Sequence, residues 1–167
     1  MGIVKKESKD EIVKLMLQEV PTEEIARRLN YSVSTIRKVF EELRDEYGVN
    51  SKMGIAVAYK KGYEVIIISG ENSPAIDFLL SKFPPLKAHQ NIRNKKELVE
   101  KILSEKNLTF ENVLYLGDDI NDMECLNAAK IKYTVENANY KVKELNIPVL
   151  KHKGGYGAFR EAVDALP

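Results

Sequence analysis

Hydrophobic residues change their spacing along the chain near Gly62. Before this point they recur every three or four residues, which is typical of amphipathic helices. After it, short unbroken runs of β-branched residues also occur, which is typical of buried strands. The pattern therefore predicts a helical domain at residues 1–62 and an α/β domain at residues 63–167.

Four helices are predicted in the first domain. An apolar stripe that includes Ile12 and Leu15 marks the first helix, and Thr22 after Pro21 begins a second one that runs to Leu29. A third helix, with Ser32 or Ser34 as its cap, runs to Tyr47 and is ended by Gly48, and the fourth covers residues 52–61.

The second domain alternates strands with helices. Two clear strands, at residues 65–68 and 112–116, are followed by Gly70 and Gly117. Weaker strands are predicted at residues 86–89, 132–135 and 148–150, and helices at residues 73–82, 94–106, 122–129 and 156–166. This alternation predicts a parallel sheet with right-handed crossovers.

Charge and composition leave the partner open. The chain has 26 Lys plus Arg against 25 Asp plus Glu, a formal net charge of +1, and one cysteine. Neither a disulfide framework nor an apolar run long enough to span a bilayer is present in the sequence. We therefore expect a soluble, cytoplasmic protein with no membrane partner, and the near-zero charge does not favour a polyanion as partner.

Polar residues follow both clear strands, where open α/β sheets bind their ligands. Asp118, Asp119 and Asp122 could together hold Mg²⁺, although an Asp here could instead only cap the next helix. At the strand end Ser69-Gly70, a hydroxyl and a backbone N–H could hold a phosphate oxygen, or this could be an ordinary strand-to-helix turn. Lys95 could reach the same phosphate, or be solvated.

In order, these motifs resemble the haloacid dehalogenase superfamily of phosphatases. The matching segments are Ile68-Ser69-Gly70, Lys95, and Gly117-Asp118-Asp119 with Asp122. The tail Gly154-Gly155-Tyr156-Gly157-Ala158-Phe159-Arg160-Glu161 is similar to the branch that contains 3-deoxy-D-manno-octulosonate 8-phosphate phosphatase and the phosphatase-like domain of some sialic acid cytidylyltransferases. The resemblance covers residues 54–166 and implies a Rossmann-like parallel sheet.

One part of the family pattern is missing. The resemblance implies a first strand that carries the nucleophile in an Asp-x-Asp motif upstream of Ser69, but the aspartates there are Asp10 and Asp45, and neither lies in such a motif. We therefore expect little phosphatase activity from this chain by itself. The strands at residues 65–68 and 113–116 must either pair directly or receive a strand from elsewhere.

The helical domain resembles a LuxR-type helix-turn-helix over residues 9–62, with the segments Thr22–Leu29, Ser32–Lys38 and Tyr47–Lys52 as its match. In such domains the third helix enters the major groove of DNA. The resemblance implies DNA contacts from Ser34, Thr35, Arg37 and Lys38, with Arg27, Arg28 and Lys52 on phosphates. The alternative is a three-helix core with a charged surface, or a dimerisation module.

Together these patterns favour a DNA-binding transcriptional regulator whose degenerate phosphatase-like domain senses a phosphorylated sugar or forms an oligomerisation surface. The alternative is a Mg²⁺-dependent sugar-phosphate phosphatase, of the 3-deoxy-manno-octulosonate 8-phosphate or acylneuraminate 9-phosphate type, whose nucleophile another chain supplies. In either case a homo-oligomer is expected.

Overall fold

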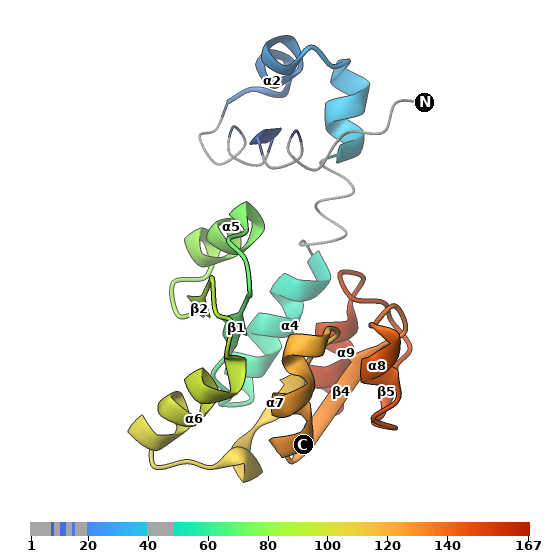
Figure 1. Ribbon diagram of the computed structural model, residues 1–167. Helices are drawn as coiled ribbons and strands as arrows, with labels where there is room; N and C mark the ends of the chain where they lie inside the picture. The colour runs from blue at the N-terminus through green and yellow to red at the C-terminus, as the bar shows by residue number, and fades with distance from the viewer. Residues whose placement is uncertain (1–7, 9–10, 13–14, 16–19, 40–48) are drawn as a thin grey trace.

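A computed structural model describes residues 8, 11–12, 15, 20–39 and 49–167 (Figure 1). The predicted end of the third helix at Tyr47 and Gly48 lies outside these residues, as does the side chain of Lys52.

The first part of the chain is helical, as predicted. Helix α2 (Thr22–Leu29) ends at Asn30, whose left-handed conformation returns its N–H to the carbonyls of Ala26 and Arg27. Residues 33–39 form the next helix, and the Ser32 hydroxyl caps it by accepting the Thr35 N–H at 3.0 Å. The apolar stripes of these helices bury one small core, which consists of Ile12, Leu15, Ile25, Ala26, Ile36 and Val39.

Helix α4 (Val49–Lys60) packs into the α/β part. Its Ile55 and Ala58 are buried in one cluster with Val163 of α9 (Ala158–Asp164). The two helices approach closely, because a Cβ added at Gly54 would lie 2.8 Å from the Phe159 ring. The chain then turns at Gly62, whose φ of 84° suits glycine.

The five predicted strands are confirmed: β1 (Ile66–Ile68), β2 (Lys87–His89), β3 (Leu114–Leu116), β4 (Ile131–Val135) and β5 (Val149–Leu150). All of their pairings are parallel. They form two separate sheets, in the orders β1-β2 and β3-β4-β5. Within the described residues no strand joins β1 to β3, so the expected single sheet is interrupted at its centre.

Helices cover both faces of this interrupted sheet (Figure 1). The remaining helices are α5 (Pro74–Lys82), α6 (Lys95–Glu105), α7 (Met123–Ala128) and α8 (Tyr140–Lys143), with 3-10 turns at Phe110–Asn112 and Ile120–Asp122. Val99 and Leu103 of α6 and Cys125 of α7 form a cluster that contacts Ile68 of β1 and Tyr115 of β3. One helical layer therefore spans both sheets.

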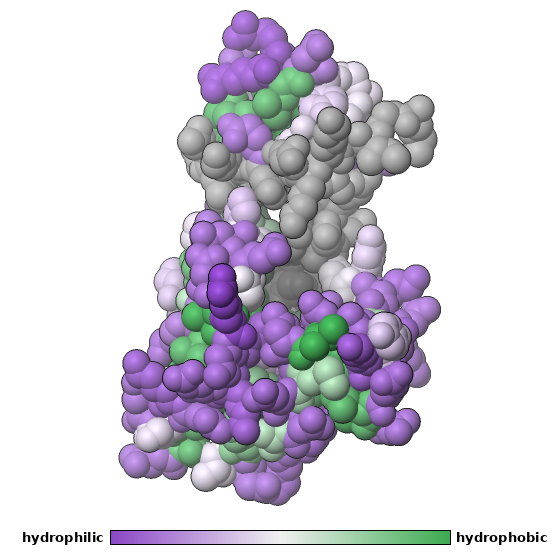
Figure 2. All heavy atoms as spheres, viewed as in Figure 1, coloured by the Kyte–Doolittle hydropathy of each residue, from purple (hydrophilic) through white to green (hydrophobic). Residues whose placement is uncertain are grey.

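The surface and the buried residues agree with this layering. In the view of Figure 2, hydrophilic residues cover most of the described surface, with smaller hydrophobic areas between them. Cys125 is fully buried, and burial raises the pKa of its thiol, so it behaves as a core residue. Among the described helices none has the length and apolar composition of a membrane span.

Candidate functional site

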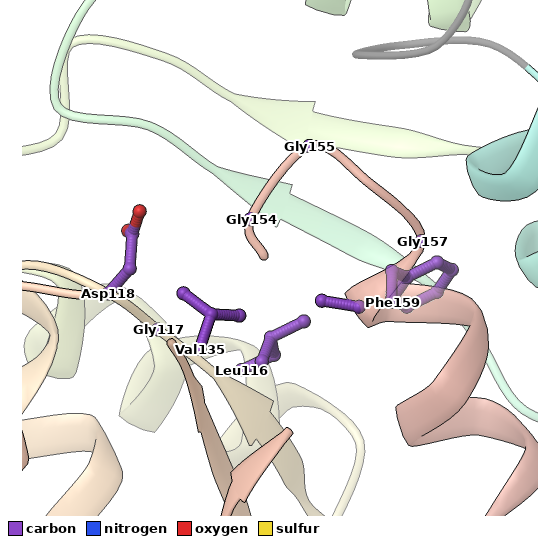
Figure 3. A pocket seen from close by; sticks show the side chains of 9 residues that line it. Leu116, Gly117, Asp118, Val135, Gly154, Gly155, Gly157 and Phe159 are labelled. Atoms are coloured by element: carbon purple, nitrogen blue, oxygen red, sulfur yellow. The ribbon is translucent and has the colours of Figure 1, made fainter. Parts of the chain in front are cut away.

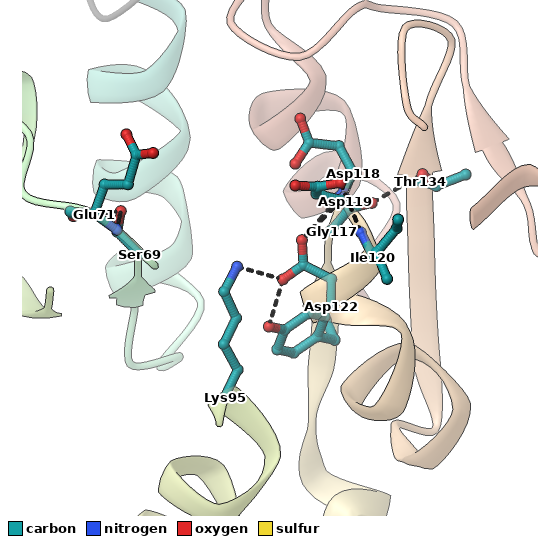
Figure 4. Close-up of polar contacts among 10 residues, drawn as sticks. Ser69, Glu71, Lys95, Gly117, Asp118, Asp119, Ile120, Asp122 and Thr134 are labelled. Atoms are coloured by element: carbon teal, nitrogen blue, oxygen red, sulfur yellow. Dashed lines mark hydrogen bonds and ion pairs between the residues drawn. The ribbon is translucent and has the colours of Figure 1, made fainter. Parts of the chain in front are cut away.

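The carboxylate of Asp122 is the centre of the polar cluster that follows β3. It accepts hydrogen bonds from Lys95 Nζ at 2.7 Å and from the Tyr115 hydroxyl at 2.9 Å (Figure 4). It also accepts the backbone N–H groups of Asp118 and Asp119, at 3.2 and 3.1 Å. Asp122 is 3% exposed and Lys95 is 8% exposed. A buried charge pair with four donors on one carboxylate is well satisfied.

Local sequence explains how these groups reach one another. Asn94 caps α6 by accepting the Glu97 N–H at 3.2 Å, which places Lys95 at the first residue of the helix. Gly117 allows the loop to close tightly, since a Cβ there would lie only 2.5 Å from the Asp122 Cβ. The hydroxyl of buried Thr134 on β4 donates to the Gly117 carbonyl at 2.8 Å and holds the loop against the sheet.

Charge and burial shift two pKa values at this site. Desolvation raises the pKa of Asp118, and the nearby charge of Asp122 adds to the effect. Burial raises the pKa of Tyr115, again with a contribution from Asp122, so its hydroxyl stays protonated as a donor. Sequence reasoning missed Tyr115, although its position two residues before Gly117 places it on one face of the strand with Val113.

The three predicted metal ligands have different roles. Asp119 caps the following turn by accepting the Ile120 N–H at 2.8 Å, and Asp122 is held by Lys95 and Tyr115. In the part of the chain that the structure describes, no three His, Cys, Asp or Glu side chains form a metal-ready group. The expected set of three ligands is therefore not assembled. The exposed Asp118 carboxylate points away from Asp122 (Figure 4) and is the remaining candidate.

Ser69 lies at the end of β1, as predicted, but its polar groups are already engaged. Its backbone N–H donates to the His89 carbonyl at 2.9 Å, so this N–H belongs to the strand pairing. Its hydroxyl donates to the Glu71 carbonyl at 2.7 Å. The loops that follow β1 and β3 converge nonetheless, because a Cβ at Gly70 would lie 3.1 Å from the Asn121 amide nitrogen.

A pocket of about 220 Å³ lies beside Asp118 (Figure 3). Its walls are the ends of β3 and β4 and the glycine-rich tail; they comprise Leu116, Gly117, Asp118, Val135, Gly154, Gly155, Gly157, Ala158 and Phe159. Gly155 and Gly157 adopt φ values of 86° and 102°, which side chains rarely allow. A Cβ at Gly154 would lie 3.7 Å from the Asp118 carboxylate, so the tail passes directly over this candidate ligand.

Glu161 secures the chain that leads into this tail. Its carboxylate accepts the backbone N–H groups of Lys151 and His152 at 3.1 and 3.0 Å, and His152 Nδ1 lies 2.8 Å from it. The hydrogen bond from His152 is the main cause that lowers the pKa of Glu161. His152 therefore contacts a carboxylate in this structure.

The residues that were predicted to contact DNA lie on the small helical part. Arg27 and Arg28 both pair with Glu24, at 2.8 Å, and Arg37 lies 3.4 Å from Glu23. Ser34 and Thr35 share hydrogen bonds with the Ser32 hydroxyl, and Lys38 is exposed on the same helix. Acidic neighbours thus offset the positive charge of the three arginines.

Comparison with known proteins identifies the α/β part. A family model of haloacid dehalogenase-like hydrolases matches residues 87–154. The 3-deoxy-D-manno-octulosonate 8-phosphate phosphatase KdsC of Haemophilus influenzae is 26% identical over 120 residues, which are 72% of this chain and 67% of that protein. KdsC of Escherichia coli K12 is 28% identical over 126 residues, 75% of this chain and 66% of that protein. The chain spans about two thirds of the length of these relatives.

Solved structures agree with this fold. The cobalt-bound deoxy-D-mannose-octulosonate 8-phosphate phosphatase of H. influenzae superposes with a TM-score of 0.63 at 27% identity, over 70% of this chain and 68% of that one. The phosphatase of Moraxella catarrhalis in complex with magnesium, phosphate and KDO has a TM-score of 0.64 at 20% identity, over 69% and 66% of the two chains. The α/β part therefore has a haloacid dehalogenase-like fold with homology to KdsC.

These findings overturn the main functional prediction. The relatives are phosphatases, so the expectation of a DNA-binding transcriptional regulator is wrong, and the phosphatase alternative is the better supported one. The LuxR-type helix-turn-helix and a DNA partner are likewise not shown. The helix-turn-helix prediction depended on short amphipathic helices around a small core, which here includes Ile25 and Ile36. Many helical modules share this pattern, so it does not identify a DNA-binding domain.

Proposed function

We propose that residues 49–167 form the phosphate-binding and Mg²⁺-binding side of a sugar-phosphate phosphatase site, and that another polypeptide chain supplies the nucleophilic carboxylate. The substrate is of the 3-deoxy-manno-octulosonate 8-phosphate or acylneuraminate 9-phosphate type. The observation that carries the proposal is the buried pair of Lys95 and Asp122, which lies beside the exposed carboxylate of Asp118 at the end of β3. The homology to KdsC supports it.

The residues present suit Mg²⁺. This ion prefers oxygen ligands and is often bound by one or two carboxylates together with substrate phosphate oxygens and water. Asp118 would be the ligand from this chain, and Asp122 would stay with Lys95. When bound, the ion would neutralise negative charge on the phosphoryl oxygens.

Lys95 would bind the phosphoryl group as a positive charge. Its ammonium carries three N–H donors, of which Asp122 accepts one, so donors remain for a phosphate oxygen. Asp122 is therefore a positioning residue, and Tyr115 orients its carboxylate through the 2.9 Å hydrogen bond. The Ser69 hydroxyl could exchange its bond to the Glu71 carbonyl for one to the phosphate.

Calorimetry on the full chain tests the proposal, with MgCl₂, inorganic phosphate and 3-deoxy-D-manno-octulosonate 8-phosphate as ligands. We expect Lys95→Met to weaken phosphate binding, and Asp118→Asn to weaken Mg²⁺ binding, each about tenfold or more. The controls are Lys96→Met, which changes a partly exposed neighbour on α6, and Asp77→Asn, which changes an exposed residue on α5. The proposal is wrong if none of the three ligands binds, or if the controls weaken binding as much as Lys95→Met and Asp118→Asn do.

A turnover assay examines the missing nucleophile separately. We expect the chain alone to release no phosphate from the sugar phosphate above background, because the sequence contains no Asp-x-Asp motif. Mg²⁺-dependent release by the pure chain would contradict the proposal that the nucleophile comes from elsewhere. The homo-oligomer stays a prediction, which light scattering can test.

A further inference from the structure

The interruption of the sheet between β1 and β3 leaves two strand edges without a partner among the described residues. On the β1 side, Lys87 donates its N–H to the Val65 carbonyl and Ser69 donates to the His89 carbonyl. In a parallel pair, alternate residues of a strand direct both their N–H and their C=O to the same neighbour. Val65 and Ser69 therefore face β2, and Ile66 and Ile68 direct their backbone groups away from it.

The same alternation applies to β3. Gly117 donates its N–H to the Tyr133 carbonyl at 3.3 Å, and the Val113 carbonyl accepts from Ile131 at 3.2 Å. Leu114 and Leu116 therefore direct their backbone groups away from β4. An unpaired N–H and C=O row on each side is a template for another strand.

Both edges belong to one layer and run in the same direction. Ile68 of β1 and Tyr115 of β3 pack on the same α6 and α7 cluster, and α9 takes part in the clusters on the opposite face of both sheets. The carboxyl ends of the two strands converge, since Gly70 meets Asn121. A segment between the edges would be parallel to both strands.

The exposure of the β1 and β3 side chains indicates which residue types such a segment would have. In a sheet covered on both faces, central strands are buried, as the last two residues of β4, Thr134 and Val135, are here, while its first three residues are partly buried. All six residues of β1 and β3 are only partly buried, although they are isoleucines, leucines and a tyrosine. An apolar, β-branched strand would cover these surfaces.

We propose that an extended apolar segment of another polypeptide chain inserts between β1 and β3, parallel to both, by strand addition. The segment has three or more β-branched residues, which alternate between the α6 face and the α4 and α9 face. Its carboxyl end emerges beside Lys95 and Asp118, where a following Asp meets the positive charge of Lys95 and any Mg²⁺ held by Asp118. Only the placement of this Asp beside Lys95 and Asp118 rests on the proposed function; the insertion of the strand does not.

Amide hydrogen exchange on the full chain, followed by NMR, tests the insertion. The probe is the peptide acetyl-Arg-Arg-Val-Ile-Val-Ile-Asp-Ser-amide. We expect it to slow exchange at least tenfold at the edge amides of Ile66, Ile68, Leu114 and Leu116. The amides of Ile67 and Tyr115, which face the existing partner strands, should not change. N-methylation of alternate peptide residues should weaken binding at least tenfold, because it removes the donors to one edge.

Three results would overturn the inference: no binding of the peptide, binding without this alternate protection, or edge amides that are already protected in the chain alone. The third result would show that this chain, or a second copy of it, already pairs with the edges. Dilution separates these two cases, because only pairing with a second copy is lost at low concentration. A second peptide, with Asn in place of the Asp, distinguishes the two proposals. Equal protection by both peptides, without any binding of phosphate or Mg²⁺, supports the insertion and removes the phosphatase proposal.

Discussion

Replacement of Lys95 by Met removes the ammonium from the buried pair and keeps a side chain of similar length. The Asp122 carboxylate, 3% exposed, then remains buried with only the Tyr115 hydroxyl and two backbone N–H groups as donors. Breaking a buried ion pair on one side costs about 3–5 kcal/mol. Because three donors remain, we expect a loss near the lower end, about 3 kcal/mol.

Thermal unfolding followed by circular dichroism measures this loss. For a chain of this size, about 3 kcal/mol corresponds to a fall in Tm of about 6–12 °C. Lys96→Met is the matched control, since the side chain of Lys96 is 39% exposed and only approaches Glu100 at 3.7 Å. Its expected cost is below about 0.5 kcal/mol. The double variant Lys95→Met with Asp122→Asn should lose less than the sum of the two single losses.

The reasoning is refuted if Lys95→Met lowers Tm no more than Lys96→Met does. That result would mean that the pair of Lys95 and Asp122 contributes no more than a surface salt bridge does. Additive losses in the double variant would likewise show that Lys95 and Asp122 do not stabilise each other.

Four further outcomes are expected. Thr134→Val leaves the Gly117 carbonyl without its donor and should cost about 1–3 kcal/mol in urea unfolding, whereas Thr134→Ser keeps the hydroxyl and should cost less. Gly117→Ala places a Cβ 2.5 Å from a neighbouring side chain, so Mg²⁺ and phosphate binding measured by calorimetry should both weaken. The pKa of Asp118 is raised, and Mg²⁺ binds the ionised carboxylate. As pH falls, Mg²⁺ binding measured by calorimetry should therefore be lost with a midpoint above the ordinary Asp pKa of about 3.9, and a midpoint at or below that value would contradict this. The pKa of Glu161 is lowered in the folded chain, so its carboxylate stabilises the tail above the pKa that it has in the unfolded chain, and this stabilisation is lost as pH falls through the lower folded pKa. Glu161→Gln should remove this pH dependence from the hydrogen-exchange rates of the Lys151 and His152 amides, which donate to the carboxylate.

The sequence alone determined the local elements and the family resemblance of the α/β part. Strands β1 and β3 lie where apolar runs followed by Gly70 and Gly117 predict them, because burial and turn chemistry act over a few residues, and the three weaker strands also lie within one residue of their predicted ranges. The positions of Ser69, Lys95 and Asp118 at strand and helix ends were predictable for the same reason. The short helix α8 and the two 3-10 turns were not predicted, since four or fewer residues carry no clear periodicity.

Only the tertiary structure decided what each polar group does. The contact of Lys95 with Asp122 joins residues 27 positions apart, so no local pattern separates Asp122, held in an ion pair, from Asp118, which we propose as the metal ligand. The interruption between β1 and β3 is likewise a matter of which strands meet, and strand pairing depends on long-range packing rather than on the propensity of each strand. The sequence lacks the Asp-x-Asp strand that the resemblance implies, and among the described residues the structure shows that β1 and β3 each have one edge without a partner strand.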